Sequence, residues 1–231
     1  MSENIPPLDF ILLDFDGTLV DSETAFAHFD AELLNDTIQK GGSPLRLTAS
    51  EVREWAGMNA EEKFSKAEEK CGFDLFEFRD DYLAKRQAGR LTLMRDMNVE
   101  LQKGVEELLR DYAHKCGIAS NKRAYKLVND LKCLGVMDYF MNRVWGAEGR
   151  FKRKPDPEML VHILQELCLA PEKVAYVGDL PDDIKAAKAA GMVAIGFVDR
   201  RSAPIDIREI FQNSGADYII DDMQELIPSL S

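Results

Sequence analysis

The sequence predicts an α/β fold, in which a parallel β-sheet carries helices on both faces and a small all-helical domain is inserted. First, short apolar runs alternate with helical patterns from residue 104 onwards, which is typical of a parallel sheet. Second, an apolar run at residues 10–13 ends at charged residues and a glycine, as a buried strand does. Third, helical patterns follow one another almost without interruption between these two regions. We therefore expect residues 1–21 and 95–231 to form the core that contains the sheet and residues 22–94 to form the helical domain.

Composition excludes several classes of protein. The 231 residues include 45% hydrophobic and 30% charged residues, which suffices for a substantial core and argues against disorder. No apolar run approaches the ~20 residues that a membrane span needs, and the first residues lack the pattern of a secretory signal. The formal net charge is −12, without a long basic stripe, which argues against non-specific binding of nucleic acid. We expect a cytoplasmic monomer or homodimer whose partner is a small molecule, not nucleic acid or a membrane.

The four cysteines are far apart and form no CxxC pair, which indicates reduced thiols. A free cysteine most often behaves as a small buried hydrophobic residue. We therefore expect each of them to be buried: Cys71, Cys116, Cys133 and Cys168.

Two aspartates stand where the first strand ends. Asp14 and Asp16 are two residues apart, so their side chains point the same way along an extended chain, and Gly17 then lets the backbone turn. Two like charges at such a place are costly unless a cation binds there. Mg²⁺ suits two carboxyl positions, because it shares its shell with water and a substrate phosphate. The simpler alternative is an Asp-Gly hairpin turn with both carboxylates in water.

The expected helical domain has two clear helix starts. Segments 48–51 and 59–62, TASE and NAEE, have the spacing of capping boxes. An apolar stripe over Phe64, Ala67 and Cys71 then ends at Gly72.

The rest of the chain alternates helices and strands. A helix is expected over residues 122–134, buried through Ala124, Val128 and Leu131. Further helices are expected at residues 104–112, 160–167 and 181–191, and further strands at residues 116–119, 143–145, 174–177, 193–198 and 218–220.

Polar residues follow these strands at their carboxyl ends, where parallel sheets bind ligands. They are Asp14 and Asp16 after the first strand, Ser120 and Asn121 after the second, Lys154 in a later loop, and Asp179 and Asp183 after a further strand. Taken singly, an N-cap explains Asn121, the first turn of a helix explains Asp183, and a solvated loop explains Lys154. Taken as a set at strand ends, they predict one functional site.

This set is complete for transfer of a phosphoryl group to a carboxylate. Asp14 is the candidate nucleophile, and Asp16 is the candidate acid for the leaving oxygen and then the base for the attacking water. Mg²⁺ and Lys154 would offset the charge of the transferred group. Asp179 would bind the metal, and Asp183, one helical turn along, would orient the metal's shell. The candidates for contacts to phosphate oxygens are Thr18, Ser120, Asn121 and Lys154.

In their order along the chain, these residues resemble the four signatures of the haloacid dehalogenase-like superfamily, in its phosphoglycolate-phosphatase-like branch. The signatures stand here as residues 14–18 (DFDGT), 120–121 (SN), 154–155 (KP) and 178–183 (GDLPDD). The resemblance implies a Rossmann-like core with the first strand central, and an aspartyl-phosphate intermediate. It implies Mg²⁺ held by the Asp14 side chain, the Asp16 backbone carbonyl and Asp179. It also implies that the helical domain is a mobile cap that closes over the substrate.

The activity implied by the resemblance is that of a Mg²⁺-dependent phosphoric monoester hydrolase. Asp16 favours phosphate chemistry over carbon–halogen cleavage, because the superfamily's dehalogenases do not use a second Asp at this position. A sugar-phosphate mutase of the β-phosphoglucomutase type and a non-catalytic binding protein stay open as alternatives. The substrate also stays open among phosphoglycolate, sugar phosphates, nucleoside monophosphates and pyrophosphate.

Substrate specificity is expected from the cap segment 53–59, whose Gly57 resembles the glycine of the family's specificity loop. Arg53 is the candidate contact to a second anionic group of the substrate, and Asn59 is the candidate contact to a hydroxyl. A surface charge at Arg53 and an N-cap at Asn59 are the alternatives.

Overall fold

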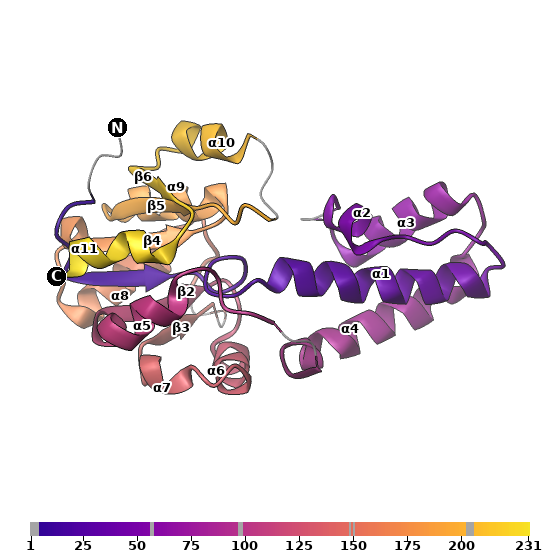
Figure 1. Ribbon diagram of the computed structural model, residues 1–231, viewed down its shortest axis with the longest axis horizontal. Coiled ribbons are helices and arrows are strands. Elements are labelled where there is room, and N and C mark those ends of the chain that lie inside the picture. Colours follow the sequence, from indigo (N-terminus) through magenta and orange to yellow (C-terminus); the bar gives the residue numbers. More distant parts are fainter. Residues whose placement is uncertain (1–4, 56–57, 97–98, 148, 150, 202–205) are drawn as a thin grey trace. The chain divides into compact units, whose positions relative to one another are not determined.

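The computed structural model describes residues 5–55, 58–96, 99–147, 149, 151–201 and 206–231 (Figure 1). The chain forms two compact units. Met1–Asp21 and Glu100–Ser231 together form the unit that contains the sheet, and Ser22–Val99 forms a helical unit. Within the described ranges, no helix is both long enough and apolar enough to span a bilayer.

The sheet has six parallel strands in the order β3-β2-β1-β4-β5-β6. They are β1 (Phe10–Leu13), β2 (Cys116–Ser120), β3 (Val144–Gly146), β4 (Val174–Gly178), β5 (Val193–Phe197) and β6 (Tyr218–Ile220). The predicted α/β class is confirmed, and β1 lies in the interior of the sheet, between β2 and β4. The strand order changes direction at β1, and ligands of such sheets bind beyond the carboxyl ends of the strands at this point.

Helices connect and cover these strands (Figure 1). They are α5 (Val105–Tyr112), α6 (Ala124–Cys133), α7 (Met137–Phe140), α8 (Glu158–Leu167), α9 (Pro181–Ala189), α10 (Ile207–Asn213) and α11 (Ile227–Leu230). Phe10 and Leu12 of β1 belong to one buried cluster with Met159 and Ile163 of α8. Because side chains alternate along a strand, Ile11 points to the opposite face of the sheet, where it is also fully buried. Both faces of β1 are therefore covered.

Some sequence-based expectations for this unit were wrong in detail. The helix expected over residues 122–134 is α6, which starts at Ala124, and its buried residues are Leu127 and Leu131, whereas Ala124 and Val128 are only partly buried. Arg123 occupies the N-cap position, so Lys122 lies before the helix. Two helices were not expected from the sequence, α7 and α10, which have only four and seven residues.

The expectation that each cysteine is buried was wrong for most of them. Only Cys116, in strand β2, is buried, whereas Cys71 is partly exposed and Cys133 and Cys168 are exposed. Cys133 and Cys168 lie at the ends of α6 and α8, where the chain turns toward solvent. All four thiols are free. Burial raises the pKa of the Cys116 thiol to about 12.

Over its described residues, 22–55, 58–96 and 99, the second unit contains four α-helices and a short 3₁₀ segment. They are α1 (Ser22–Lys40), α2 (Ala49–Arg53), α3 (Ala60–Cys71), η1 (Phe76–Phe78) and α4 (Arg79–Asp96). The predicted capping boxes are confirmed, since Thr48 and Glu51 begin α2 and Asn59 and Glu62 begin α3. The buried side chains of Leu34, Val52, Trp55, Phe64 and Tyr82 are part of the core of this unit.

A buried ion cluster joins three helices of the helical unit. Asp30 on α1 accepts hydrogen bonds from Arg86 Nε on α4 at 2.7 Å and from Lys63 Nζ on α3 at 2.8 Å. The Asp30 side chain is fully buried. Burial alone would raise the pKa of Asp30, but the hydrogen bonds from Arg86 and Lys63 outweigh it and lower this pKa.

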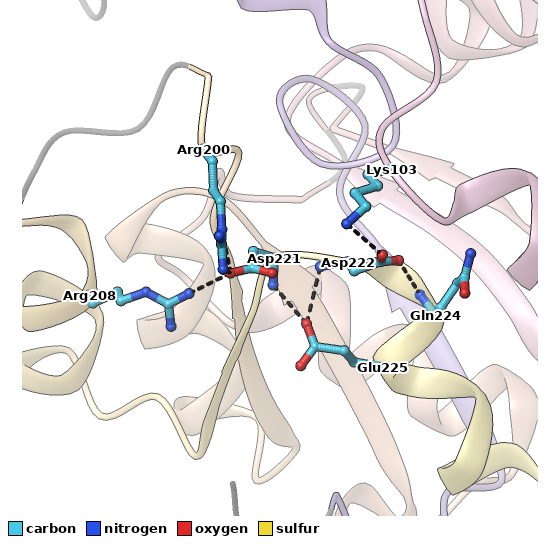
Figure 2. A network of polar contacts seen from close by, with 7 residues as sticks. All are labelled: Lys103, Arg200, Arg208, Asp221, Asp222, Gln224 and Glu225. Carbon is cyan, nitrogen blue, oxygen red and sulfur yellow. Dashed lines mark hydrogen bonds and ion pairs between the residues drawn. The ribbon is translucent and has the colours of Figure 1, made fainter.

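A polar network at the carboxyl end of β6 ties separate segments of the sheet unit together (Figure 2). Asp221 accepts hydrogen bonds from Arg200 Nε at 2.8 Å and from Arg208 at 2.9 Å. The neighbouring Asp222 lies 3.0 Å from Lys103 Nζ. The segment after β5 and the segment before α5 are therefore both fixed to the end of β6.

Candidate active site

The turn after β1 places its polar residues by backbone hydrogen bonds. Asp14 N–H donates to Val177 O at 2.9 Å, so Asp14 continues the pairing of β1 with β4. Gly17 N–H then donates to Val20 O at 3.0 Å and closes a tight turn. Gly17 has a φ of +77°, and a Cβ built on it would lie 2.1 Å from Asp179 Oδ2. Only glycine meets both conditions, which is why the turn can pack against Asp179.

Three of the predicted carboxylates come together at the carboxyl ends of β1 and β4. Asp14, Asp179 and Asp183 each offer an oxygen, and these oxygens all lie within 4.8 Å of one another. Thr18 Oγ1 donates a hydrogen bond to Asp179 Oδ1 at 2.9 Å. Asp183 Oδ2 accepts from Leu180 N–H at 3.0 Å, within the first turn of α9. Asp179 is therefore held from the turn after β1, and Asp183 is held by the backbone at the start of α9.

Lys154 enters this cluster from the loop before α8. Its Nζ lies 2.9 Å from Asp14 Oδ1 and 2.6 Å from Asp183 Oδ1, and it donates to Tyr176 Oη at 2.5 Å. Burial favours a neutral lysine, but Asp14, Tyr176 and Asp183 more than offset this and raise the pKa of Lys154 well above its usual value. Lys154 is therefore a permanent cation among the carboxylates.

One lysine does not neutralise three carboxylates. Burial, followed by the charges of Asp183 and Asp14, raises the pKa of Asp179 well above its ordinary value. Burial also raises the pKa of Asp183 to about 6, although Lys154 acts in the opposite direction. Crowded carboxylate oxygens of this kind form a donor set that fits a hard divalent cation, which would relieve their mutual repulsion.

Ser120 and Asn121 lie beside this cluster at the end of β2. Ser120 is buried, and its Oγ accepts from Lys122 N–H at 3.4 Å. Asn121 Oδ1 accepts from the Lys154 backbone N–H at 2.9 Å, so Asn121 holds the loop that carries Lys154. The structure thus gives Asn121 and Thr18 contacts within the protein, and their contacts to phosphate stay predictions.

Asp16 points to a different set of neighbours. Its Oδ1 lies 3.2 Å from Lys122 Nζ, and its side chain is 32% exposed, whereas Asp14 is buried. The two predicted carboxylates of the DFDGT turn therefore contact different lysines: Asp14 contacts Lys154, and Asp16 contacts Lys122.

Sequence reasoning missed three residues that support the site. Tyr176 on β4 donates its hydroxyl to Ala119 O at 2.6 Å while it accepts from Lys154. Gln102 is buried and donates to Gly17 O at 3.1 Å, which fixes the turn after β1. Lys122 contacts Asp16. A tyrosine within the apolar run VAYVG and a lysine directly after Ser120 and Asn121 were visible in the sequence, but nothing local pointed to Gln102.

The two candidate specificity residues lie in the helical unit. Arg53 Nη2 donates to Thr24 Oγ1 at 2.9 Å, and the described residues offer no acceptor to its buried Nε. Asn59 Oδ1 accepts from Glu62 N–H at 3.0 Å, so the N-cap that was the alternative is present. The candidate Gly57 lies outside the described residues. The substrate contacts of Arg53 and Asn59 stay predictions.

Comparison with known proteins places this geometry in a family. Residues 11–197 match the model of the haloacid dehalogenase-like hydrolase family. The chain is 32% identical to a phosphoglycolate phosphatase of Nitrosococcus oceani, over 96% of each sequence. It is 28% identical to a structure of a haloacid dehalogenase-like protein of unknown function from Agrobacterium tumefaciens, with a TM-score of 0.73 over 96% of each chain. A candidate β-phosphoglucomutase of Thermotoga maritima shares the fold, with a TM-score of 0.71 at 21% identity over 96% of this chain and 98% of that one.

The family match covers the DFDGT turn, the Ser120–Asn121 end of β2, the Lys154 loop and the Asp179–Asp183 segment. The structure brings Asp14, Lys154 and Asp183 into contact from three of these segments. The resemblance predicted from sequence is confirmed, and the chain belongs to the haloacid dehalogenase-like hydrolase family.

Proposed function

We propose that this chain is a Mg²⁺-dependent phosphatase that hydrolyses a small phosphate monoester through an aspartyl phosphate on Asp14. The observation that carries the proposal is the meeting of the Asp14, Asp179 and Asp183 carboxylates, with the Lys154 ammonium in contact with Asp14 and Asp183. The relative named phosphoglycolate phosphatase supports the same reaction class. Such a relative favours phosphoglycolate as the first substrate to test.

The metal would be held by the side chains of Asp14 and Asp179 and by the backbone carbonyl of Asp16. Bound there, Mg²⁺ supplies positive charge to the phosphoryl oxygens. Asp183 contacts Lys154 and the backbone of Leu180. We therefore propose that Asp183 orients the side chains of this cluster and does not itself contact the substrate.

The residues of the chain perform the two halves of the reaction. An Asp14 oxygen attacks phosphorus while the bond from phosphorus to the ester oxygen breaks and Asp16 gives that oxygen a proton. Water then attacks phosphorus, Asp16 takes a proton from the water, and Asp14 leaves as the free carboxylate. Lys154 stays charged throughout, and with Thr18, Ser120 and Asn121 it forms the proposed phosphate pocket.

We also propose that the helical unit acts as a cap that carries specificity through Arg53 and Asn59. Its two connections to the sheet unit lie side by side, because Asp21 N–H donates to Glu100 O at 2.9 Å. This pairing sits directly after the DFDGT turn, so a movement of the helical unit would start next to the catalytic residues.

The proposal is tested by phosphate release from a panel of monoesters, with Mg²⁺ or with EDTA. The panel contains phosphoglycolate, sugar phosphates, nucleoside monophosphates and pyrophosphate. We expect metal-dependent release, abolished by Asp14→Asn and kept by Asp9→Asn, the same substitution at an exposed position before β1. Asp179→Asn should weaken Mg²⁺ binding in calorimetry, which is a readout independent of turnover.

Other outcomes would favour the alternatives. Isomerisation of a sugar phosphate in the presence of a sugar bisphosphate, without phosphate release, would indicate a mutase. No reaction in either assay, together with saturable binding of a phosphorylated ligand, would indicate a binding protein.

A further inference from the structure

We propose that Lys122 is a positioning residue that holds the Asp16 carboxylate in place for the second half of the reaction, and that Asp130 anchors Lys122. The inference rests on the proposed function and goes beyond it, because neither residue belongs to the family signatures noted in the sequence. Both residues lie in the sheet unit, in the segment that leads into α6 and on α6 itself.

The Lys122 ammonium lies between two carboxylates. Its Nζ is 3.2 Å from Asp16 Oδ1 and 2.8 Å from Asp130 Oδ2. The Lys122 and Asp130 side chains are 17% and 18% exposed, so the anchoring pair is largely shielded from solvent. Ion pairs shielded in this way are less screened than surface pairs and restrict the side chains that form them.

The ring of Phe15 forms one wall for the same ammonium. Lys122 Nζ lies 4.3 Å from the centroid of this ring, and Phe15 is fully buried. A cation above the face of a fixed aromatic ring gains a further electrostatic attraction from the ring. Phe15 is the neighbour of Asp16 in the chain, so the contact ties Lys122 to the segment that it orients.

The backbone of Lys122 is fixed as well. Its carbonyl oxygen accepts from Ala147 N–H at 3.1 Å, just after β3. Gly146 makes this close approach possible, since a Cβ built on Gly146 would lie 2.5 Å from Lys122 O. Both ends of the lysine are therefore held, and the ammonium is preorganised rather than recruited from solvent.

This arrangement suits the half-reaction in which Asp16 acts as a base. Water attacks phosphorus, the bond from phosphorus to Asp14 breaks with its electron pair going to Asp14, and the water proton goes to Asp16. Lys122 contacts Asp16 Oδ1 and leaves Oδ2 as the proton acceptor. Without Lys122, the partly exposed Asp16 side chain would turn among several rotamers, and hydrolysis of the aspartyl phosphate would slow.

A direct contact of Lys122 with the substrate phosphate is the competing role for this residue. Its ammonium is already shared between Asp16 and Asp130, which makes it a poor ligand for a third anion. The two roles differ in their kinetics, because loss of a phosphate ligand raises KM or slows phosphorylation, whereas loss of a positioned base traps the phosphorylated enzyme.

The test measures trapped phosphoenzyme with ³²P-labelled p-nitrophenyl phosphate, whose leaving group departs without a proton. Steady-state mixtures of full-length protein, Mg²⁺ and this ester are quenched in acid, and the protein-bound label is counted. In Lys122→Met we expect the fraction of labelled protein to rise and kcat to fall roughly tenfold at an unchanged or lower KM. Asp130→Asn should show the same change to a smaller extent.

Two further variants distinguish a positioning role of Lys122 from a general loss of folding or activity. Lys122→Arg keeps the cation and should recover most of the parental rate, with little trapped label. Lys132→Met removes an exposed lysine of α6 and should behave as the parent does. If Lys122→Met does not fold, as judged by circular dichroism, Asp130→Asn decides the question, because it retains Lys122 and nearly preserves the size of the side chain.

The possible failures are distinguishable. A parent protein that releases no phosphate with Mg²⁺ overturns the proposed function and with it this inference. An active parent whose Lys122→Met and Asp130→Asn variants trap no phosphoenzyme overturns the inference alone. A raised KM for Lys122→Met with unchanged kcat also overturns it and makes Lys122 a substrate ligand instead.

Discussion

Lys154 and Asp14 form an ion pair at the centre of the site, with 2.9 Å between Lys154 Nζ and Asp14 Oδ1. The same ammonium contacts Asp183 and Tyr176. The proposed nucleophile is therefore tied to a cation from a distant loop before any substrate arrives. This relationship leads to the first prediction.

Lys154→Met should reduce both stability and activity. It leaves the buried Asp14 and Asp183 carboxylates without their cation, which we expect to cost roughly 3 kcal/mol of unfolding free energy. We expect kcat to fall by roughly 10²–10³-fold, as when a preorganised donor is removed from a developing charge. Urea denaturation and steady-state kinetics measure the two effects, and Lys152→Met, at a side chain that is 75% exposed, is the control. Parental stability in Lys154→Met would contradict the structural role of the ion pair.

Gly17→Ala should displace the Asp179 side chain in addition to straining the backbone at residue 17. Its added Cβ would lie 2.1 Å from Asp179 Oδ2, and the positive φ adds a strain of roughly 1–2 kcal/mol. We expect weaker Mg²⁺ binding, measured by calorimetry, together with lower activity. Gly135→Ala is the matched control, because Gly135 has a φ of +71° and open space around it. Equal Mg²⁺ affinity in the two variants would show that the contact with Asp179 does not matter.

The helical unit should lose stability in acid through Asp30. Because Arg86 and Lys63 lower the pKa of Asp30 in the folded protein, its carboxylate stabilises the fold above its unfolded pKa of about 4. That contribution is lost as the pH falls below this value toward the lower folded pKa. We expect urea unfolding, followed by fluorescence of the buried Trp55 in a Trp145→Phe background, to shift to lower urea over this window.

The variant Asp30→Asn tests whether the Asp30 carboxylate causes this loss of stability in acid. At neutral pH the variant should be less stable by roughly 3–5 kcal/mol, because Arg86 and Lys63 remain buried without their anion. Its stability should then depend less on pH below about 4 than that of the parent. Asp36→Asn, at a carboxylate that is 52% exposed, should leave the acid transition in place. An unchanged slope in Asp30→Asn would assign the acid sensitivity to other groups.

Arg53→Ala should raise KM for an ester with a second acidic group, such as phosphoglycolate, by about tenfold or more, the effect expected on losing a charged hydrogen bond. An ester without that group should be affected much less. Comparison of KM and kcat on this pair of substrates measures the effect. Thr24→Val removes the hydroxyl that Arg53 Nη2 contacts and tests whether that bond orients the side chain. No change in any kinetic constant of Arg53→Ala would remove this specificity proposal.

Local patterns in the sequence determined the sheet class, the buried first strand and the two capping boxes of the helical unit, whereas the central place of the first strand was implied by the family resemblance. These features depend on residues close together in the chain, such as the apolar run before Asp14 or the spacing of Asn59 and Glu62. The meeting of the polar residues that follow the strands could also be predicted from the sequence, because in a parallel sheet the carboxyl ends of the strands lie along one edge. The membership of Asp14, Asp179 and Asp183 in one site followed from that rule.

Contacts between distant residues were decided only by the tertiary structure. The sequence does not say that Lys122 turns to Asp16, because the residues around Lys122 do not specify which distant carboxylate its ammonium meets. The support from Tyr176 and Gln102 depends on side chains that reach across strands and loops. The exposure of Cys133 and Cys168 depends on where helix ends meet solvent, which hydrophobicity alone does not determine. Short-range patterns fix which elements form, whereas packing fixes which of their polar atoms meet.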